Sequence, residues 1–328
     1  MSFAVLGLAL LLAVHLVVST SLSLLVALAV HWVEAHPLGS PARRTSVLLF
    51  LGLLPALGGL AVAPGLALPA WLVHEPPGTS ETAGPVLVAL AAAGAALVLG
   101  RAAAALLDQW RTIRLVRRWS AVGRPLAGLP LPATLFAHEF PVAAMVGVVR
   151  DRLFLAERLV RALSPEELDG VVAHEAAHRA ARDNLKRLLL RASPDLLALS
   201  GPGVRLRQAF EDAAEAEADA RACARVSPLV LARALLKVAS LVPPGQRLDA
   251  AVAALHRDGS LSARVRALVA AHEGADTNPE EPARPDRSAK RGLGTVLAVA
   301  TLAVLATAGA LALRPVHGLL EALVHLLS

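Results

Sequence analysis

The sequence has 328 residues, of which 55% are hydrophobic, with a mean hydropathy of +0.58 and a formal net charge of +6 at pH 7. This composition is too apolar for an ordinary soluble domain of this length, so it favours a membrane protein. Cys223 is the only cysteine, which excludes both an intramolecular disulfide and a cysteine-rich metal site.

Four apolar stretches are each long enough to cross a bilayer, which takes about 20 helical residues. They cover residues 3–32, 47–73, 83–107 and 293–313. The first has no basic residues before it and is too long for the hydrophobic part of a signal peptide, so we expect it to remain as a span. The second contains Pro55, Pro64 and Pro69, which predict a kink, with a re-entrant segment as the alternative.

Basic residues in the loops predict the orientation of these spans. Arg43 and Arg44 follow the first span, whereas residues 74–81 carry acidic residues and no Lys or Arg. Arginines gather after the third span, at Arg101, Arg111, Arg114, Arg117, Arg118 and Arg124. These charges place the amino terminus outside and residues 109–291 in the cytoplasm. Lysine is nearly absent, which suggests a GC-rich bacterial genome, so we expect a multi-pass protein of the bacterial inner membrane. Most of the net positive charge then lies beside the spans, and we expect no direct nucleic-acid binding because no DNA-binding motif accompanies it.

The chain accordingly divides into five parts. Three spans occupy residues 1–108, a cytoplasmic domain 109–277, a Pro- and charge-rich linker 278–291, a fourth span 292–314 and a short tail 315–328. Within the cytoplasmic domain, three short strands are expected at 133–138, 143–149 and 153–156, the last two joined as a hairpin. Helices are expected after Ser164, over 206–226, over 227–240 and over 261–272.

The helix after Ser164 carries the most informative motif. Ser164 and Glu167 form a capping box, Pro165 takes the first helical position, and no Gly or Pro occurs between Val171 and Ser193. His174-Glu175-Ala176-Ala177-His178 is an HExxH motif, in which two histidines four residues apart share one helix face and can reach one metal ion. Glu175 is then placed to take a proton from an activated water. An ordinary amphipathic helix with solvated His and Glu is the alternative.

A third protein ligand is expected on the next long helix. Glu215 to Asp219 form an ExxAD pattern, in which Glu215 is the predicted third ligand. Asp219, one turn later, can accept a hydrogen bond from a ligand imidazole. Asp183 is a candidate for the same supporting role, with an ordinary surface aspartate as the alternative. Taken alone the acidic cluster also fits a solvated face, but together with HExxH it favours a metal site.

Peptide hydrolysis at such a site would also need a donor for the oxyanion. The chain has no tyrosine. Arg221, His256 and His272 are the candidates, and Arg221 is preferred because it follows Glu215 by less than two helical turns. His15 and His31 are expected to be tolerated polar residues of the first span rather than a second metal site.

The stretch from about residue 131 to 270 resembles the catalytic domain of membrane-embedded gluzincin metallopeptidases. It is most similar to the β-lactam sensor-transducer proteases of the BlaR/MecR type, through residues 147–155, 163–168, 171–178, 182–185, 210–211 and 215–219. The HtpX and CAAX-prenyl-protease family shares HExxH and ExxAD and is second. A domain between the third and fourth spans favours the first family. Residues 314–328 are too few for its sensor domain, so the resemblance does not extend to antibiotic sensing.

The resemblance implies one zinc ion at His174, His178 and Glu215, with Glu175 as the catalytic base; the spacing alone permits other divalent ions. The predicted fold is an α-helical membrane protein with four spans and an α+β, zincin-like cytoplasmic catalytic domain. The predicted function is a membrane-bound zinc endopeptidase that cleaves a cytosolic or membrane-proximal protein. The resemblance also implies a regulatory, antirepressor-like role with a transcriptional repressor as substrate. The alternatives are an HtpX-like quality-control protease and a non-catalytic signalling protein with a structural metal, against which the presence of Glu175 argues.

Overall fold

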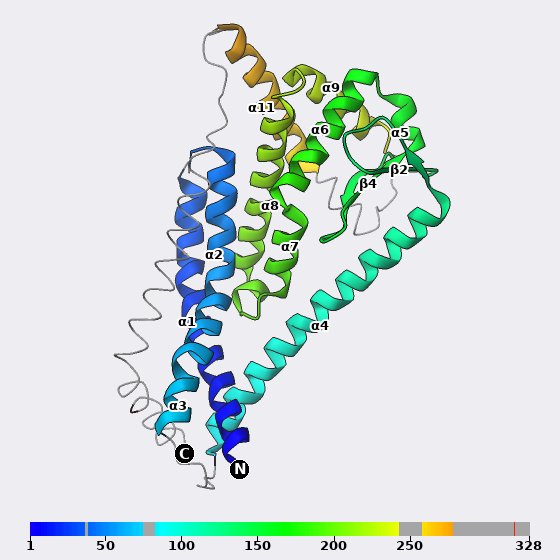
Figure 1. Ribbon diagram of the computed structural model, residues 1–328. Coiled ribbons are helices and arrows are strands. Elements are labelled where there is room, and N and C mark those ends of the chain that lie inside the picture. The colour runs from blue at the N-terminus through cyan, green and yellow to red at the C-terminus, as the bar shows by residue number, and fades with distance from the viewer. Residues whose placement is uncertain (37–38, 75–82, 243–257, 278–317, 319–328) are drawn as a thin grey trace.

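The computed structural model describes residues 1–36, 39–74, 83–242, 258–277 and 318. Within these ranges the molecule is elongated (Figure 1): long helices form one end, and a small sheet with shorter helices forms the other. The predicted linker and the predicted fourth span lie outside the described residues.

Three long helical stretches make up the amino-terminal part. They are α1 (Phe3–Ala35), the continuous path of α2 (Pro41–Val62), η1 (Ala63–Ala67) and α3 (Leu68–His74), and α4 (Pro85–Val122). Each is long and apolar enough to cross a membrane, as predicted for the first three spans. The interruption expected in the second span is a π-helical turn at η1, which contains Pro64 and Gly65.

Small residues allow these helices to approach one another closely. A methyl group at Gly94 on α4 would lie 2.6 Å from the carbonyl oxygen of Leu12 on α1. A methyl group at Gly59 on α2 would lie 2.5 Å from Nδ1 of His15. The glycines therefore set the packing distance, as small residues do between membrane helices.

The sheet has four short strands in the order β1-β2-β4-β3. They are β1 (Arg124–Leu126), β2 (Ala133–Phe136), β3 (Ala143–Val146) and β4 (Arg152–Ala156). The three predicted strands and the predicted hairpin are confirmed, since β3 pairs antiparallel with β4. β2 pairs parallel with β4, which leaves β3 at an edge. β1 was not predicted, because a three-residue strand with a central proline has no alternating pattern.

Shorter helices complete the carboxyl-terminal part. They are α5 (Glu157–Ala162), α6 (Pro165–Ala181), α7 (Asp183–Ala192), the 3-10 turn η2 (Leu197–Leu199), α8 (Gly201–Ala222), α9 (Pro228–Ser240) and α11 (Asp258–Thr277). The predicted capping box is present, with both hydrogen bonds between Ser164 and Glu167. Val171 and Val172 of α6 pack into the core of the sheet beside Phe154. This packing fixes α6 against the strands.

The segment after Val171 is two helices rather than one. Arg182 adopts the left-handed conformation with φ 56° and ψ 41°, and it separates α6 from α7. Its amide donates to the carbonyl of Arg179, which closes α6. No Gly or Pro occurs at this break, so the sequence pattern did not predict it.

The antiparallel pair of α7 and α8 links this part to the long helices. Figure 1 shows the pair extending alongside α2, away from the sheet. Leu190 of α7 and Leu206 of α8 form one apolar cluster with Val26 of α1 and Leu48 of α2. The two ends of the molecule therefore share a packed interface.

Candidate metal centre

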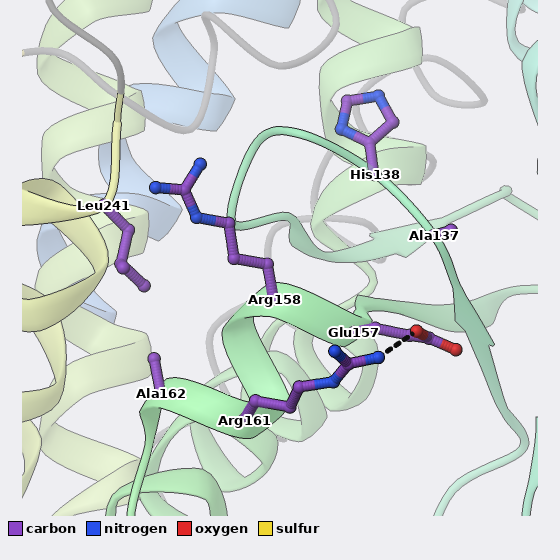
Figure 2. A pocket seen from close by; sticks show the side chains of 7 residues that line it. All are labelled: Ala137, His138, Glu157, Arg158, Arg161, Ala162 and Leu241. Atoms are coloured by element: carbon purple, nitrogen blue, oxygen red, sulfur yellow. Dashed lines mark hydrogen bonds and ion pairs between the residues drawn. The ribbon is translucent and has the colours of Figure 1, made fainter.

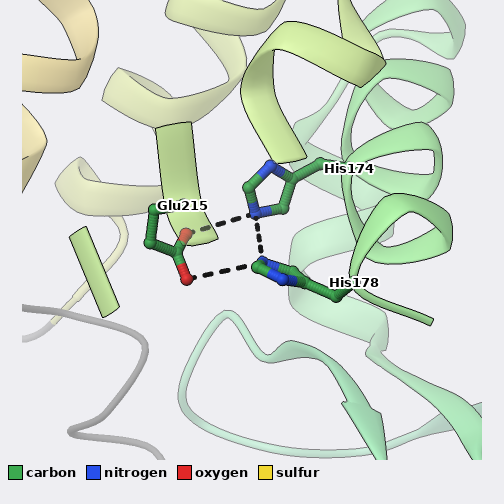
Figure 3. Close-up of side chains that lie close together, drawn as sticks. All are labelled: His174, His178 and Glu215. Carbon is green, nitrogen blue, oxygen red and sulfur yellow. Dashed lines mark hydrogen bonds and ion pairs between the residues drawn. The ribbon is translucent and has the colours of Figure 1, made fainter. Parts of the chain in front are cut away.

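Two helices bring three potential ligands together. His174 and His178 come from α6 and Glu215 from α8, and their side chains point at one another (Figure 3). The two Nε2 atoms are 3.1 Å apart, and Glu215 approaches His174 Nε2 at 3.3 Å and His178 Nε2 at 3.4 Å. Both histidines are buried.

These distances fit a tetrahedral zinc site. Ligand atoms that each lie about 2.0–2.1 Å from a tetrahedral ion are about 3.3 Å from one another. The two imidazoles also present the correct nitrogens. Nδ1 of His174 lies 2.9 Å from Asp219 Oδ1, and Nδ1 of His178 lies 2.8 Å from Asp183 Oδ2. With Nδ1 of each ring facing a carboxylate, Nε2 of each ring faces the point where the three potential ligands converge.

The electrostatics favour an ionised third ligand. Burial by itself would raise the pKa of the Glu215 carboxyl, but hydrogen bonds from His174 and His178 hold that pKa well below its usual value. Lys186 pairs with Asp183 at 2.8 Å. Burial opposes the ionisation of Asp183, but its bonds to His178 and Lys186 lower its pKa.

Arg264 on α11 supports the centre and was not predicted from the sequence. Its guanidinium donates two hydrogen bonds of 2.7 Å to the carboxylate of Asp219 and lies 3.0 Å from Glu215 Oε2. These bonds lower the pKa of Asp219 against the opposing effect of its burial. Nothing in the local pattern distinguishes Arg264 from the exposed Arg266, so only the tertiary fold identifies it.

The HExxH glutamate contacts the edge strand. Glu175 is buried, and its Oε2 accepts a hydrogen bond of 2.8 Å from the amide of Met145 in β3. Asn184 at the start of α7 donates to the carbonyls of Met145 and Gly147 at 2.9 and 2.8 Å. Hydrogen-bonding directions alternate along a strand, so residues two apart point to the same side. The N–H and C=O of Met145 point away from β4, to the outer edge of β3, and those of Ala143 therefore point to the same edge.

Three residues were predicted as donors for the oxyanion: Arg221, His256 and His272. Arg221 pairs with Glu217 and donates to the carbonyl of Ala177 at 3.4 Å, so its guanidinium bridges α8 and α6. His272 is half-buried on α11, and His256 lies outside the described residues. Arg264, and not Arg221, directs its guanidinium at the third ligand.

A shallow pocket lies beside the sheet and is lined by other residues (Figure 2). His138, Arg158 and Leu241 border it, together with Arg161, which pairs with Glu157 at 2.7 Å. None of the three potential ligands lines this pocket. The metal centre is thus defined by converging polar side chains and not by this hollow.

Comparison with known families supports a peptidase. The sequence model described as Peptidase family M48 matches residues 114–278, half of the chain. This match includes α6, α8 and all three potential ligands. No curated protein and no solved structure matches the chain significantly.

Proposed function

The chain belongs to peptidase family M48, and we propose that it is a zinc-dependent endopeptidase of the bacterial inner membrane with a cytoplasmic catalytic domain. The family supports a metalloprotease, and the three long apolar helices suggest a membrane protein. The observation that carries the proposal is the convergence of His174, His178 and Glu215 at the spacing of zinc ligands, with Glu175 beside them.

In this proposal, His174, His178 and Glu215 hold one zinc ion, and Asp219 and Asp183 orient the two imidazoles. A zinc ion bound there supplies Lewis acidity, which lowers the pKa of water to about 7 and polarises a peptide carbonyl.

Glu175 acts as the general base and then as the general acid. The Met145 amide fixes one oxygen of its carboxylate, and the other takes a proton from the attacking water. As the peptide C–N bond breaks, the same carboxyl delivers the proton to the leaving nitrogen. Arg264 keeps Asp219 and Glu215 in place during the reaction and adds positive charge beside them.

The substrate backbone is proposed to bind along the outer edge of β3. An extended peptide can add to a strand edge through main-chain hydrogen bonds. Ala143 offers its N–H and C=O there, close to the strand position that holds Glu175. A peptide added at this edge would bring a scissile carbonyl to the metal centre. Because main-chain hydrogen bonds hold it there, this placement would not depend on most of the substrate's side chains.

The proposed biological role is regulatory. A cytoplasmic site tethered to spans reaches proteins at the inner membrane surface, and the resemblance to BlaR/MecR proteases suggests a transcriptional repressor as substrate. Housekeeping proteolysis of damaged membrane proteins, as the HtpX resemblance suggests, is the alternative. A signalling protein with a purely structural metal is the third reading, and the placement of Glu175 argues against it because a structural site needs no base.

The test compares a strain that carries Glu175→Gln with its parent. Transcripts and the amino-terminal peptides of cleaved proteins are measured together. Loss of a repressor fragment, with silencing of one set of genes, supports the regulatory role. Accumulation of many unrelated membrane proteins supports quality control, and an unchanged set of protein fragments contradicts peptidase activity altogether.

A further inference from the structure

The hairpin of α7, η2 and α8 reaches far along the first long helix. At its tip, the carbonyl oxygen of Pro194 lies 2.9 Å from Nε2 of His15, and the amide of Leu197 donates to Ser23 Oγ at 3.2 Å. His15 is about 18 Å along α1 from Phe3, at 1.5 Å per residue. The hydrocarbon core of a bilayer is about 30 Å thick, so a core that begins near Phe3 ends near Ser23, and the His15 contact lies about 12 Å inside that end.

We propose that this hairpin is a re-entrant element of the membrane, whose tip lies among lipid acyl chains beside α1, α2 and α4. The outward side chains at the tip are apolar: Leu199 is 65% exposed and Val204 is 42% exposed. On the opposite face, Leu190 and Leu206 pack against Gly52 in the middle of α2. The exposed side chains of Leu199 and Val204 thus continue the apolar surface of the long helices.

The hydrogen bonds at the tip favour immersion over a position in water. Irregular backbone at membrane depth is tolerated only where its polar groups find partners inside the protein. Arg101 of α4 donates to the carbonyls of Ser193 and Leu190 at 2.9 and 3.1 Å. Arg207 donates to the carbonyl of Ala198 at 2.7 Å. A turn in water would not need an arginine from a membrane helix to satisfy its carbonyls.

Two ion pairs hold the arms of the hairpin to the long helices farther along, outside that core. Arg205 of α8 lies 3.6 Å from Glu34 near the end of α1, and Arg191 of α7 pairs with Asp108 of α4. Long cationic side chains commonly extend from the edge of the hydrocarbon core towards the polar interface. The apolar tip and the charged pairs above it form the pattern expected of a hairpin inserted from one side.

The hairpin ties the metal centre to the membrane. Glu215 is about 21 Å along α8 from Gly201, so the helix that carries the third potential ligand is anchored at its other end by the inserted tip. The substrate class that follows is a protein segment immediately next to a transmembrane span. This consequence rests on the proposed peptidase function, whereas the insertion of the hairpin does not.

Spin labels in liposomes test the insertion. Cys223 is first replaced by alanine, and single cysteines are introduced as Leu199→Cys, Val204→Cys and, as a control in the β3–β4 turn, Val149→Cys, where the native side chain is 91% exposed. Labels at Leu199 and Val204 are expected to collide with oxygen and to be shielded from a water-soluble nickel chelate, and the control label is expected to show the reverse. Two tip positions guard against a variant that does not fold. Equal nickel accessibility at the tip and the control would overturn the proposal.

A second experiment tests the substrate class with the full-length protein in the same liposomes. Single-span substrates carry one cleavable segment either roughly 5 or roughly 40 residues from the span, at up to about 3.5 Å per residue. Faster cleavage of the short-spacer substrate is expected, and equal or slower cleavage refutes the membrane-proximal preference. If neither is cleaved, the proposed peptidase function fails, and the spin labels still decide the position of the hairpin.

Discussion

The backbone amide of Met145 donates a hydrogen bond of 2.8 Å to Oε2 of Glu175, which joins the edge strand to the proposed catalytic base. The carbonyl of the same residue accepts from Asn184, which also binds the carbonyl of Gly147. Asn184 therefore holds the piece of strand that in turn positions Glu175.

Replacing Asn184 with alanine is expected to lower kcat by roughly 10- to 100-fold, because a small displacement of a catalytic group is costly. Zinc content should not change, since Asn184 contacts β3 and not the three ligands. The measurement is the cleavage rate of a peptide substrate together with metal content. Val149→Ala, in the exposed turn, is the control. Unchanged kcat in Asn184→Ala would show that the strand does not depend on this amide.

The metal ligands make a second prediction. His174→Ala, His178→Ala and Glu215→Ala should each lose stoichiometric zinc, because each removes one of three protein ligands. Asp219→Asn and Asp183→Asn, which affect the orientation of the imidazoles, should weaken zinc binding by about 10- to 100-fold. Glu175→Gln should keep the metal and abolish cleavage.

Metal content and competition with a chelator measure these effects. Glu166→Ala removes an exposed carboxylate at the start of α6 and serves as the control. Zinc binding by Glu215→Ala as tight as that of the parent would exclude Glu215 as the third ligand.

The orientation of the spans in the membrane can be measured with reporter fusions. Fusions at Gly123 and Pro279 are expected to report the cytoplasm, and a fusion at Gly78 the outside. The reason is the excess of arginine after α4 compared with the loop before it. An external signal at Gly123 would invert the topology and move the proposed site to the other side of the membrane.

Stability should depend on pH through Glu167 and Lys237, which form a hydrogen bond of 2.6 Å. The bonds from Lys237 and from the amide of Ser164 lower the pKa of Glu167. A carboxyl group with a lowered folded pKa contributes stability that is present above its unfolded pKa of about 4.3 and is lost as pH falls through the folded value.

Lys237→Met should therefore destabilise the protein by about 1 kcal/mol at pH 7, since the pair is partly exposed. The difference from the parent should shrink below about pH 4, as Glu167 takes up its proton. Thermal unfolding in detergent, followed by tryptophan fluorescence at both pH values, measures it. Arg233→Met on the same helix is the control, and a Lys237→Met effect that grows on acidification would contradict the assignment.

The parts of the structure that were predictable are mostly those formed by residues close together in the sequence. The capping box at Ser164 and the hairpin of β3 and β4 depend on neighbouring residues, so the sequence pattern contains them. The approach of His174 to Glu215 is not local. It was nevertheless predictable, because two histidines on one helix face need a third ligand, and ExxAD offers one.

Features that depend on the tertiary fold were not predictable. Arg264 reaches the centre only because α11 packs beside α8, and Arg182 breaks a helical pattern without any Gly or Pro. The sequence does not show what covers the leucines of α7 and α8, and in the structure Leu190 and Leu206 pack on α2. Periodicity gives the face that is apolar but not the partner that covers it.

The break at Arg182 has a consequence for biosynthesis. It directs α7 away from α6, so that Asp183, which orients His178, and Glu215 lie on opposite arms of one hairpin. A ribosome makes the HExxH helix well before the segment that carries Glu215. The nascent chain therefore has only two of the three ligands until both arms are made and have closed against α6. An incomplete chain would therefore not bring the three potential ligands together, so the site forms only after the whole hairpin has been made.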